Sequence, residues 1–223
     1  MRFKESIRYA LLIVIVFLLW LIVSESYEKR KLQILAATGH ARSPVSNQTG
    51  NKCGLPNPCP AGHFAFYLKT GVANVVGPKI CFDGRVIMSG AHNNIGHGLN
   101  IVVVDAATGE VEKYDYFNMY SESVDHLVKF LKDLKEGMLV LVATFDDPAT
   151  KMTDEVRELF THLGSSHVNL LKFRDSWLFA GATGISQKSP FETVVHNDEK
   201  TNFFNGWPSA LDLGGCFPQK FER

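Results

Sequence analysis

The sequence has no excess of charge of either sign, and this absence excludes one large class of function. Its 23 Lys and Arg side chains are balanced by 23 Asp and Glu side chains. No stretch concentrates basic residues with aromatic ones, which is the pattern that a nucleic-acid-binding surface requires. We therefore expect no nucleic-acid partner.

Sequence motifs of the common enzyme classes are also missing. The chain has no G-x-S-x-G, no H-E-x-x-H and no phosphate-binding loop, and its glycine-bearing segment 90–98 lacks the order of a dinucleotide-binding loop. Asp146 and Asp147 follow an apolar run and could do acid–base chemistry there. They can equally form a turn before Pro148, because Asp favours turns, and we favour the turn. The protein is therefore predicted not to be an enzyme and to need no cofactor.

The apolar run near the N-terminus is shorter than the roughly 20 residues that span a bilayer. It extends without charge from Ala10 to Val23, after a basic flank and before the small residues of Ser24-Glu25-Ser26. This layout predicts a signal peptide over residues 1–26, and hence a secreted, extracellular protein that is not inserted in a membrane after cleavage. An uncleaved Golgi-type anchor, which Trp20 favours, is the alternative.

The segment that follows has little apolar content. Residues 27–52 are polar, contain Pro44 and Gly50, and show no hydrophobic period, so we expect a flexible leader before a single domain over 53–223. Asn47, in Asn47-Gln48-Thr49, is a candidate site of N-glycosylation.

Cysteines are few, and no C-x-x-C pair is present. Two nearby histidines, His92 and His97, do not lie at zinc-finger spacing, so a zinc site is the less favoured interpretation. We also favour an exposed loop over a paired-histidine metal site for these two. An even number of cysteines in a secreted chain predicts two disulfides, and the local sequence leaves three ways of pairing open. The cysteines are Cys53, Cys59, Cys81 and Cys216.

The first half of the domain reads as strands and the second half as strands alternating with helices. Short β-prone runs separated by glycine-containing turns predict strands over 63–68, 74–76, 79–81, 86–88 and 99–104.

In the second half, helix caps and apolar stripes predict two helices, one from Ser123 to Gly137 and one from Thr153 to Gly164. Met138–Phe145 reads as a strand buried on both faces, and 177–180 as another buried strand. A capping box at 189–192 predicts a third short helix. Together these elements predict an α/β layered domain.

Several unusual motifs occur in one order along the chain and resemble the cytokine-like family with sequence similarity 3, also described as the interleukin-like EMT inducer family. The resemblance covers about residues 52–219 and implies a secreted factor that acts on a cell-surface receptor. It implies a compact β-β-α fold of two twisted sheets with flanking helices, unlike a four-helix cytokine. It also implies the disulfides Cys53–Cys81 and Cys59–Cys216. Among the motifs are Cys53-Gly54-Leu55, Ala73-Asn74-Val75-Val76-Gly77-Pro78, Gly96-His97-Gly98-Leu99-Asn100, Phe173-Arg174-Asp175-Ser176-Trp177 and Gly206-Trp207-Pro208.

A related module in the stem of a sugar transferase binds carbohydrate, and this suggests an alternative function as a carbohydrate-binding module with a glycan partner. The residues that face the sugar there fall on His97, Asp146 and Arg174 of this sequence. His97 is a departure, because the related module has arginine there, and histidine lacks the two-pronged hydrogen bonding of a guanidinium. The segment 173–177 thus has two interpretations of equal weight, a ligand-binding cluster or an Arg–Asp pair beside a core tryptophan.

Overall fold

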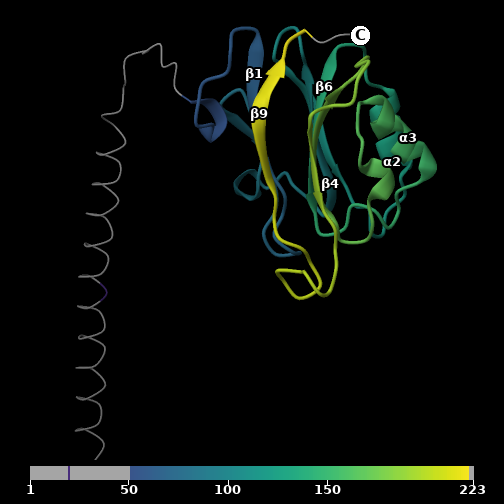
Figure 1. Ribbon diagram of the computed structural model, residues 1–223. Coiled ribbons are helices and arrows are strands. Elements are labelled where there is room, and N and C mark those ends of the chain that lie inside the picture. Colours follow the sequence, from purple (N-terminus) through teal and green to yellow (C-terminus); the bar gives the residue numbers. More distant parts are fainter. Residues whose placement is uncertain (1–19, 21–50, 221–223) are drawn as a thin grey trace, which may run out of the picture. The chain divides into compact units, whose positions relative to one another are not determined.

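The computed structural model of the protein describes Trp20 and residues 51–220 (Figure 1). The predicted signal peptide apart from Trp20, almost all of the predicted leader, and Asn47 therefore lie outside the described residues. The domain predicted from Cys53 onward lies in the compact unit that extends from Thr49 to the end of the chain. Within the described part of the chain, no helix is both long and apolar enough to cross a membrane.

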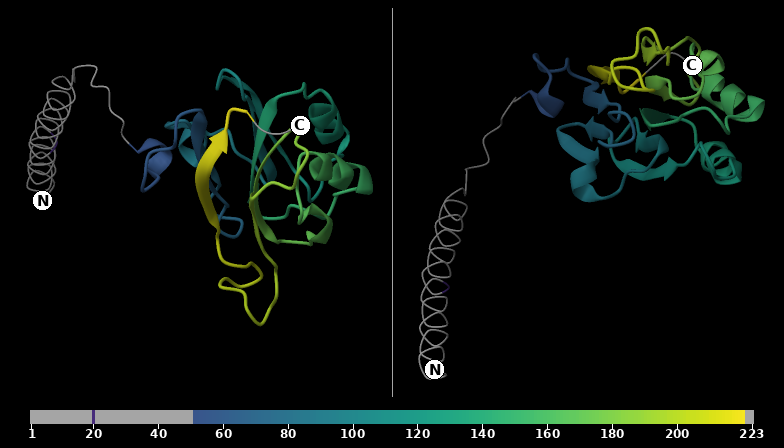
Figure 2. Two further views of the ribbon diagram at one scale, coloured as in Figure 1. Left: turned by 45° about the horizontal axis from the view of Figure 1, so that its top comes forward. Right: turned by 90° about the horizontal axis from the view of Figure 1, so that it is seen from below.

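Between residues 51 and 220, two antiparallel sheets and two α-helices form three layers, with both helices on the outer face of the larger sheet (Figures 1 and 2). The smaller sheet has the order β3–β2–β1–β9, formed by Arg85–Met88, Lys79–Phe82, His63–Lys69 and Asp212–Pro218. The larger sheet has the order β5–β4–β6–β7–β8, formed by Val111–Phe117, Gly98–Asp105, Met138–Phe145, Ser176–Ala182 and Phe191–Val195. The helices are α2, Asp125–Lys132, and α3, Asp154–His162. This arrangement confirms the predicted β-β-α fold of two sheets with flanking helices.

The middle strand of the larger sheet, β6, is buried along its whole length, as its continuous apolar sequence predicts. Val140 and Val142 contribute to the core beneath the helices, whereas Leu139 and Leu141 contribute to the core between the two sheets. A strand alternates its side chains between its two faces, so a strand covered on both faces must be apolar at every position.

Helix α3 begins as its sequence predicts, and helix α2 ends earlier. The Thr153 side chain caps α3 by accepting a hydrogen bond from the Val156 backbone N–H at 3.3 Å. Helix α2 stops at Lys132 instead of continuing to Gly137. Near its end, the Lys113 ammonium group donates to the Phe130 carbonyl at 2.8 Å, which satisfies a carbonyl that a longer helix would use.

The predicted third helix is wrong, because residues 191–195 form the edge strand β8. Ser189, the expected cap, donates to the Ala180 carbonyl at 2.5 Å, next to the pairing of Ala180 with Phe191. Glu192 accepts hydrogen bonds from the Trp177 indole at 2.9 Å and from the Ser165 hydroxyl instead of closing a capping box. Pairing with β7 therefore overrides the local helix signal.

Three further differences concern strands. The predicted strand 74–76 is a turn closed by an isolated bridge between Val72 and Val76. Strand β5 was not predicted, although its exposure alternates residue by residue, because three of its positions are charged. Strand β9 was not predicted either, because Gly214 and Gly215 reduce its β propensity, yet it pairs with β1 along its whole length.

Two disulfides join the start of the domain to the smaller sheet. They link Cys53 to Cys81 and Cys59 to Cys216, which are the pairs that the family resemblance implies. The second bridge spans 157 residues of sequence and fastens the segment before β1 to strand β9. Loop closure in the unfolded chain becomes more costly as the loop lengthens, so this bridge restricts the unfolded state more than the first.

We expect removal of the long-range bridge to lower the stability and secreted yield of the protein. Loss of a native disulfide from a small secreted domain costs about 2–5 kcal/mol, a large share of a typical net stability of about 5–15 kcal/mol. The measurement is the secreted yield of Cys216→Ser and of Cys59→Ser/Cys216→Ser, with Asn47→Gln as the control that leaves both bridges intact. A yield for the cysteine variants equal to that of Asn47→Gln would contradict this expectation.

Candidate functional site

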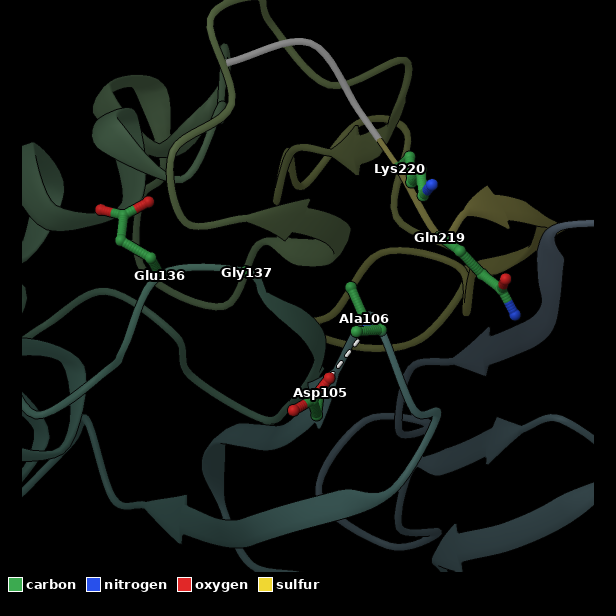
Figure 3. Close-up of a pocket in the computed structure, with 7 residues that line it drawn as sticks. Asp105, Ala106, Glu136, Gly137, Gln219 and Lys220 are labelled. Atoms are coloured by element: carbon green, nitrogen blue, oxygen red, sulfur yellow. Dashed lines mark hydrogen bonds between the residues drawn. The ribbon is translucent and has the colours of Figure 1, made fainter.

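A shallow cavity lies away from the residues that the sequence analysis singled out. It has a volume of about 490 Å³ and lies where β4 ends and β6 begins, near Asp105 and Glu136 (Figure 3). The Asp105 carboxylate accepts from the backbone N–H groups of Ala107 and Thr108 at 2.7 and 3.1 Å, so it serves a turn. We therefore place the candidate site at the opposite end of these strands.

Strand register brings His97, Asp146 and Arg174 together at that end. Gly98 at the start of β4 pairs with Phe145 at the end of β6, so the residues just beyond them, His97 and Asp146, are neighbours. Strand β7 pairs antiparallel with β6 on its other side and begins two residues after Arg174. Three segments that are distant in sequence thus converge at the end of β6, as the carbohydrate-module resemblance implies.

Asp146 is the centre of this cluster. Its Oδ1 accepts a hydrogen bond from the Trp207 indole N–H at 2.8 Å. Its Oδ2 lies 3.3 Å from Nδ1 of His97, and its Oδ1 lies 3.8 Å from Nε of Arg174. One partly buried carboxylate therefore contacts a histidine, an arginine and a tryptophan from three different loops.

The neighbouring carboxylate, Asp147, has a different task. It is 1% exposed and accepts from the backbone N–H groups of Ala149, at 3.0 Å, and Thr150. It also accepts from the Arg174 backbone N–H at 3.2 Å. The turn interpretation of the Asp pair therefore fits Asp147, whereas the Asp146 side chain belongs to the cluster.

The backbone at the cluster is held in an uncommon conformation. Asp146 has φ of 63° and Arg174 has φ of 60°, the left-handed region that residues other than glycine adopt only when their surroundings fix them. Such conformations concentrate at functional sites in proteins. Hydrogen bonding of Asp147 to the Arg174 backbone helps to fix one of them.

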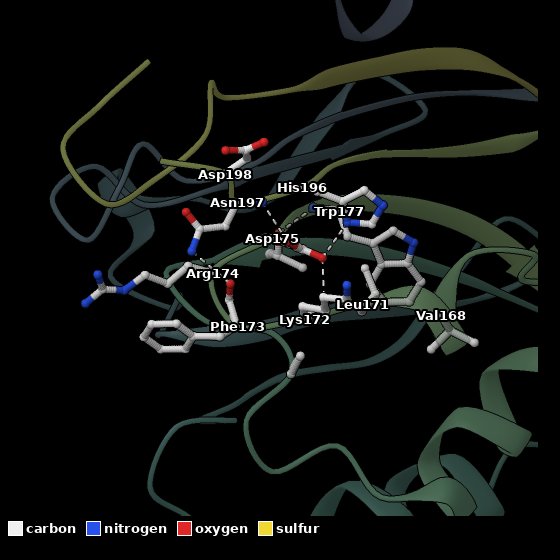
Figure 4. Close-up of polar contacts among 12 residues, drawn as sticks. Val168, Leu171, Lys172, Phe173, Arg174, Asp175, Trp177, His196, Asn197 and Asp198 are labelled. Carbon is white, nitrogen blue, oxygen red and sulfur yellow. Dashed lines mark hydrogen bonds and ion pairs between the residues drawn. The ribbon is translucent and has the colours of Figure 1, made fainter. Parts of the chain in front are cut away.

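The Arg174 guanidinium lies against two aromatic rings. Its Cζ is 3.9 Å from the centroid of the Trp207 ring and 4.6 Å from that of the Phe173 ring, and Figure 4 shows it extended beside Phe173. Within the described residues, its Nε is buried and has no hydrogen-bond partner. Gly206 lies beside it, since a Cβ there would be 3.0 Å from a terminal guanidinium nitrogen.

The His97 ring stacks on Phe145, and the glycines on either side of His97 in the chain pack closely against strand β5. The two rings stack with centroids 4.4 Å apart and an interplanar angle of 14°. A Cβ at Gly96 would lie 2.1 Å from the Tyr116 ring, and a Cβ at Gly98 would lie 2.0 Å from the Phe117 carbonyl oxygen. The glycines of the G-H-G motif are therefore required by close packing.

The second histidine of that segment, His92, lies in a short 3-10 turn and is exposed. Among residues 51–220, no group of three or more His, Cys, Asp or Glu side chains is arranged to hold a metal ion.

Exposed aromatic side chains continue on both sides of Arg174. Phe173 lies 6.3 Å from Tyr120, and Phe204, which forms a β-bridge with Trp207, lies 4.9 Å from Phe203, as measured between ring centroids. We call this set the aromatic row; it consists of Tyr120, Phe173, Arg174, Trp207, Phe204 and Phe203. Its outer members are open to solvent, with Tyr120 59% and Phe203 76% exposed.

Trp207 is a site residue that the sequence patterns do not reveal. Its motif, Gly206-Trp207-Pro208, indicates the family but not a role in the site. A tryptophan flanked by glycine and proline was the available signal, but the link between Trp207 and Asp146 depends on how the chain returns from β8 to β9.

We expect Asp146→Ala to destabilise the protein more than Asp146→Asn. Alanine removes the acceptor of the Trp207 indole and tolerates the left-handed backbone poorly, whereas asparagine keeps an oxygen there and tolerates that backbone. The expected difference in the free energy of unfolding is about 1–2 kcal/mol, measured by denaturant titration. Equal stabilities of the two variants would show that the carboxylate oxygen does not hold Trp207.

Comparison with known proteins agrees with the motifs in the sequence. The profile of the family described as Interleukin-like EMT inducer matches residues 97–185, which include His97, Asp146 and Arg174. The chain is 46% identical to Protein FAM3D of Homo sapiens over 225 residues, covering 99% of each chain. It is 42% identical to Protein FAM3A of Homo sapiens over 99% of this chain and 98% of that one, and 52% identical to Protein FAM3C of Danio rerio over 77% and 76%. The chain therefore belongs to the FAM3 family of interleukin-like proteins.

Proposed function

We propose that the protein is a secreted, cytokine-like signalling protein that binds a cell-surface receptor through the aromatic row. Membership of an interleukin-like family and the two disulfides support an extracellular signalling role. The aromatic row supports the contact surface, because Tyr, Trp and Arg are the residues in which the binding energy of protein interfaces concentrates.

The observation that carries this proposal is the position of Arg174 between Phe173 and Trp207. Stacking on two rings restricts the guanidinium before any partner arrives, so less side-chain entropy is lost on binding. The exposed rings of Phe203 and Tyr120 lie at the two ends of the row and can exclude water around the charged centre.

The cluster supports a binding role better than a catalytic one, and we propose that the protein is not an enzyme. The Asp146 carboxylate is already engaged by the Trp207 indole, His97 and Arg174. No cysteine of the described chain is a free thiol that could act as a nucleophile. We expect Asp146→Asn to leave signalling largely intact and to abolish no hydrolytic activity.

A second candidate function is the binding of a glycan at the same cluster. Its support is the convergence of His97, Asp146 and Arg174 beside the Trp207 ring, because carboxylate, guanidinium and an aromatic face together suit sugar hydroxyls and the apolar face of a sugar ring. The two candidates differ in their dependence on the outer members of the aromatic row, which lie beyond the cluster.

We expect changes in the aromatic row to weaken binding to receptor-bearing cells. Arg174→Ala should reduce affinity at least about tenfold, since an arginine anchor at the centre of an interface typically costs about 2 kcal/mol or more when truncated, and Phe203→Ala, at the end of the row, should reduce affinity by a smaller but measurable factor. The measurement is saturation binding of labelled protein to cells from a receptor-expression array. Tyr114→Ala is the matched control, because Tyr114 is a 49% exposed aromatic residue outside the row. A loss of binding with Tyr114→Ala alone would move the receptor surface to strand β5.

If a glycan or an anionic ligand occupies the cluster, His97→Arg should increase affinity at neutral pH and Arg174→Ala should abolish binding. Arginine supplies the two-pronged hydrogen bonds that histidine lacks, and lower pH should act in the same direction by protonating His97. A glycan array compares the two variants with wild type. Binding that changes with neither substitution would place the ligand elsewhere, and dependence on Phe203 without any glycan signal would favour the receptor.

A further inference from the structure

We infer that Asp175 and His196 form a pH-sensitive clasp that positions the Trp207 side of the binding cluster, a role of regulation that rests on the proposed function. The clasp holds a loop, residues 196–207, which we call the strap. The strap leaves the end of β8 and carries three members of the aromatic row, Phe203, Phe204 and Trp207.

The strap has little apolar burial to hold it in place. None of its residues is buried, and its most apolar member, Phe203, is 76% exposed. It is joined to the rest of the domain by polar contacts and by the stacking of Trp207 on the Arg174 guanidinium. A segment with few buried apolar contacts opens locally at low cost, so these polar contacts decide how firmly it is held.

Asp175 is the anchor at the start of the strap. It is 1% exposed, and its Oδ1 accepts from the Asn197 backbone N–H at 2.8 Å. Its Oδ2 lies 2.8 Å from Nδ1 of His196 and also accepts from the Lys172 backbone N–H at 2.8 Å (Figure 4). One buried carboxylate therefore joins the strap to the loop that carries Arg174.

The charge of His196 determines the strength of this anchor. Its side chain is 50% exposed and can exchange protons with solvent, and an imidazole changes charge between about pH 5 and pH 8. Neutral His196 donates an ordinary hydrogen bond to Asp175, whereas protonated His196 makes a charge-assisted bond that is about twice as strong. The additional hold is therefore present at acidic pH and is lost as the pH rises.

The charged residues next to the clasp in the chain are Lys172 and Arg174, which both precede Asp175, and Asp198, which lies two residues beyond His196 (Figure 4). A second histidine–carboxylate contact of the site, His97 with Asp146 at 3.3 Å, lies at the Trp207 end of the strap. The contribution of His97 to any pH dependence therefore has to be separated from that of His196.

The far end of the strap reaches the binding cluster directly. The Trp207 indole donates to Asp146 at 2.8 Å and its ring covers the Arg174 guanidinium at 3.9 Å. A strap that is held firmly keeps the Trp207 ring over Arg174, and a strap that opens leaves one face of the guanidinium bare. Acidic pH thus favours the assembled form of the aromatic row.

Hydrogen–deuterium exchange of the full chain tests the clasp without any receptor. We expect peptides within 196–207 to be about fivefold more protected at pH 5.5 than at pH 7.4, after correction for the intrinsic exchange rate. His196→Asn should remove this difference, because asparagine keeps an N–H donor near the Nδ1 position but does not titrate. Asp175→Asn keeps only one of the two acceptor oxygens and sets an amide N–H against one of their donors, so it should remove the difference and also lower the protection of the strap at both pH values.

Two histidine variants serve as controls. His162 is exposed at the end of α3, so His162→Asn should leave the pH dependence of strap protection unchanged. If His196 is the source of that pH dependence, His97→Asn should leave it unchanged as well. Unchanged protection of β6 peptides shows that each variant is folded. A strap equally protected at both pH values in wild type, or a pH dependence that survives His196→Asn, would overturn the clasp. Failure to find a receptor would leave this result untouched, and failure of the clasp would leave receptor binding untouched.

Discussion

The pairing of β6 with its two neighbours is the constraint on which both the core and the candidate site depend. Every residue of β6 is buried, because one face packs against the helices and the other against the smaller sheet. A strand covered on both faces has no freedom to slip by one residue without exchanging its two apolar sets. The register with β4 and β7 is thereby fixed, and it places His97 and Arg174 on either side of Asp146.

Three carboxylates at the end of β6 and just before β7 have different roles: two of them stabilise loops, and the third belongs to the candidate site. Asp147 and Asp175 are each 1% exposed and are occupied mainly by backbone N–H groups, so they shape the loops. Asp146 is more exposed and binds side chains only, from His97, Arg174 and Trp207. The hydrogen bonds of the first two carboxylates fix the loops that bring the partners of Asp146 to it.

Sequence patterns predicted the parts of the fold whose environment is apolar and continuous. The run 138–145 and the Thr153 cap were sufficient for β6 and α3, because burial on both faces and a side-chain cap leave direct marks on the sequence. The capping box at 189–192 gave a wrong helix, because pairing with β7 outweighs a local preference of about 1 kcal/mol. His97, Asp146 and Arg174 entered through family resemblance, and nothing in their spacing alone would have joined them.

Balanced charge, four cysteines, an apolar central strand and the ordered motifs of the FAM3 family can all be read in the sequence, and they are enough to assign the class of the protein. Which residues meet depends on the tertiary fold. Trp207 contacts Asp146, 61 positions away in the sequence, and His196 contacts Asp175, 21 positions away. Both Trp207 and His196 lie in the strap, which has no hydrophobic periodicity and no buried residue. Local patterns record burial and backbone preference, whereas contacts between polar side chains depend on where the sheets place the ends of their strands.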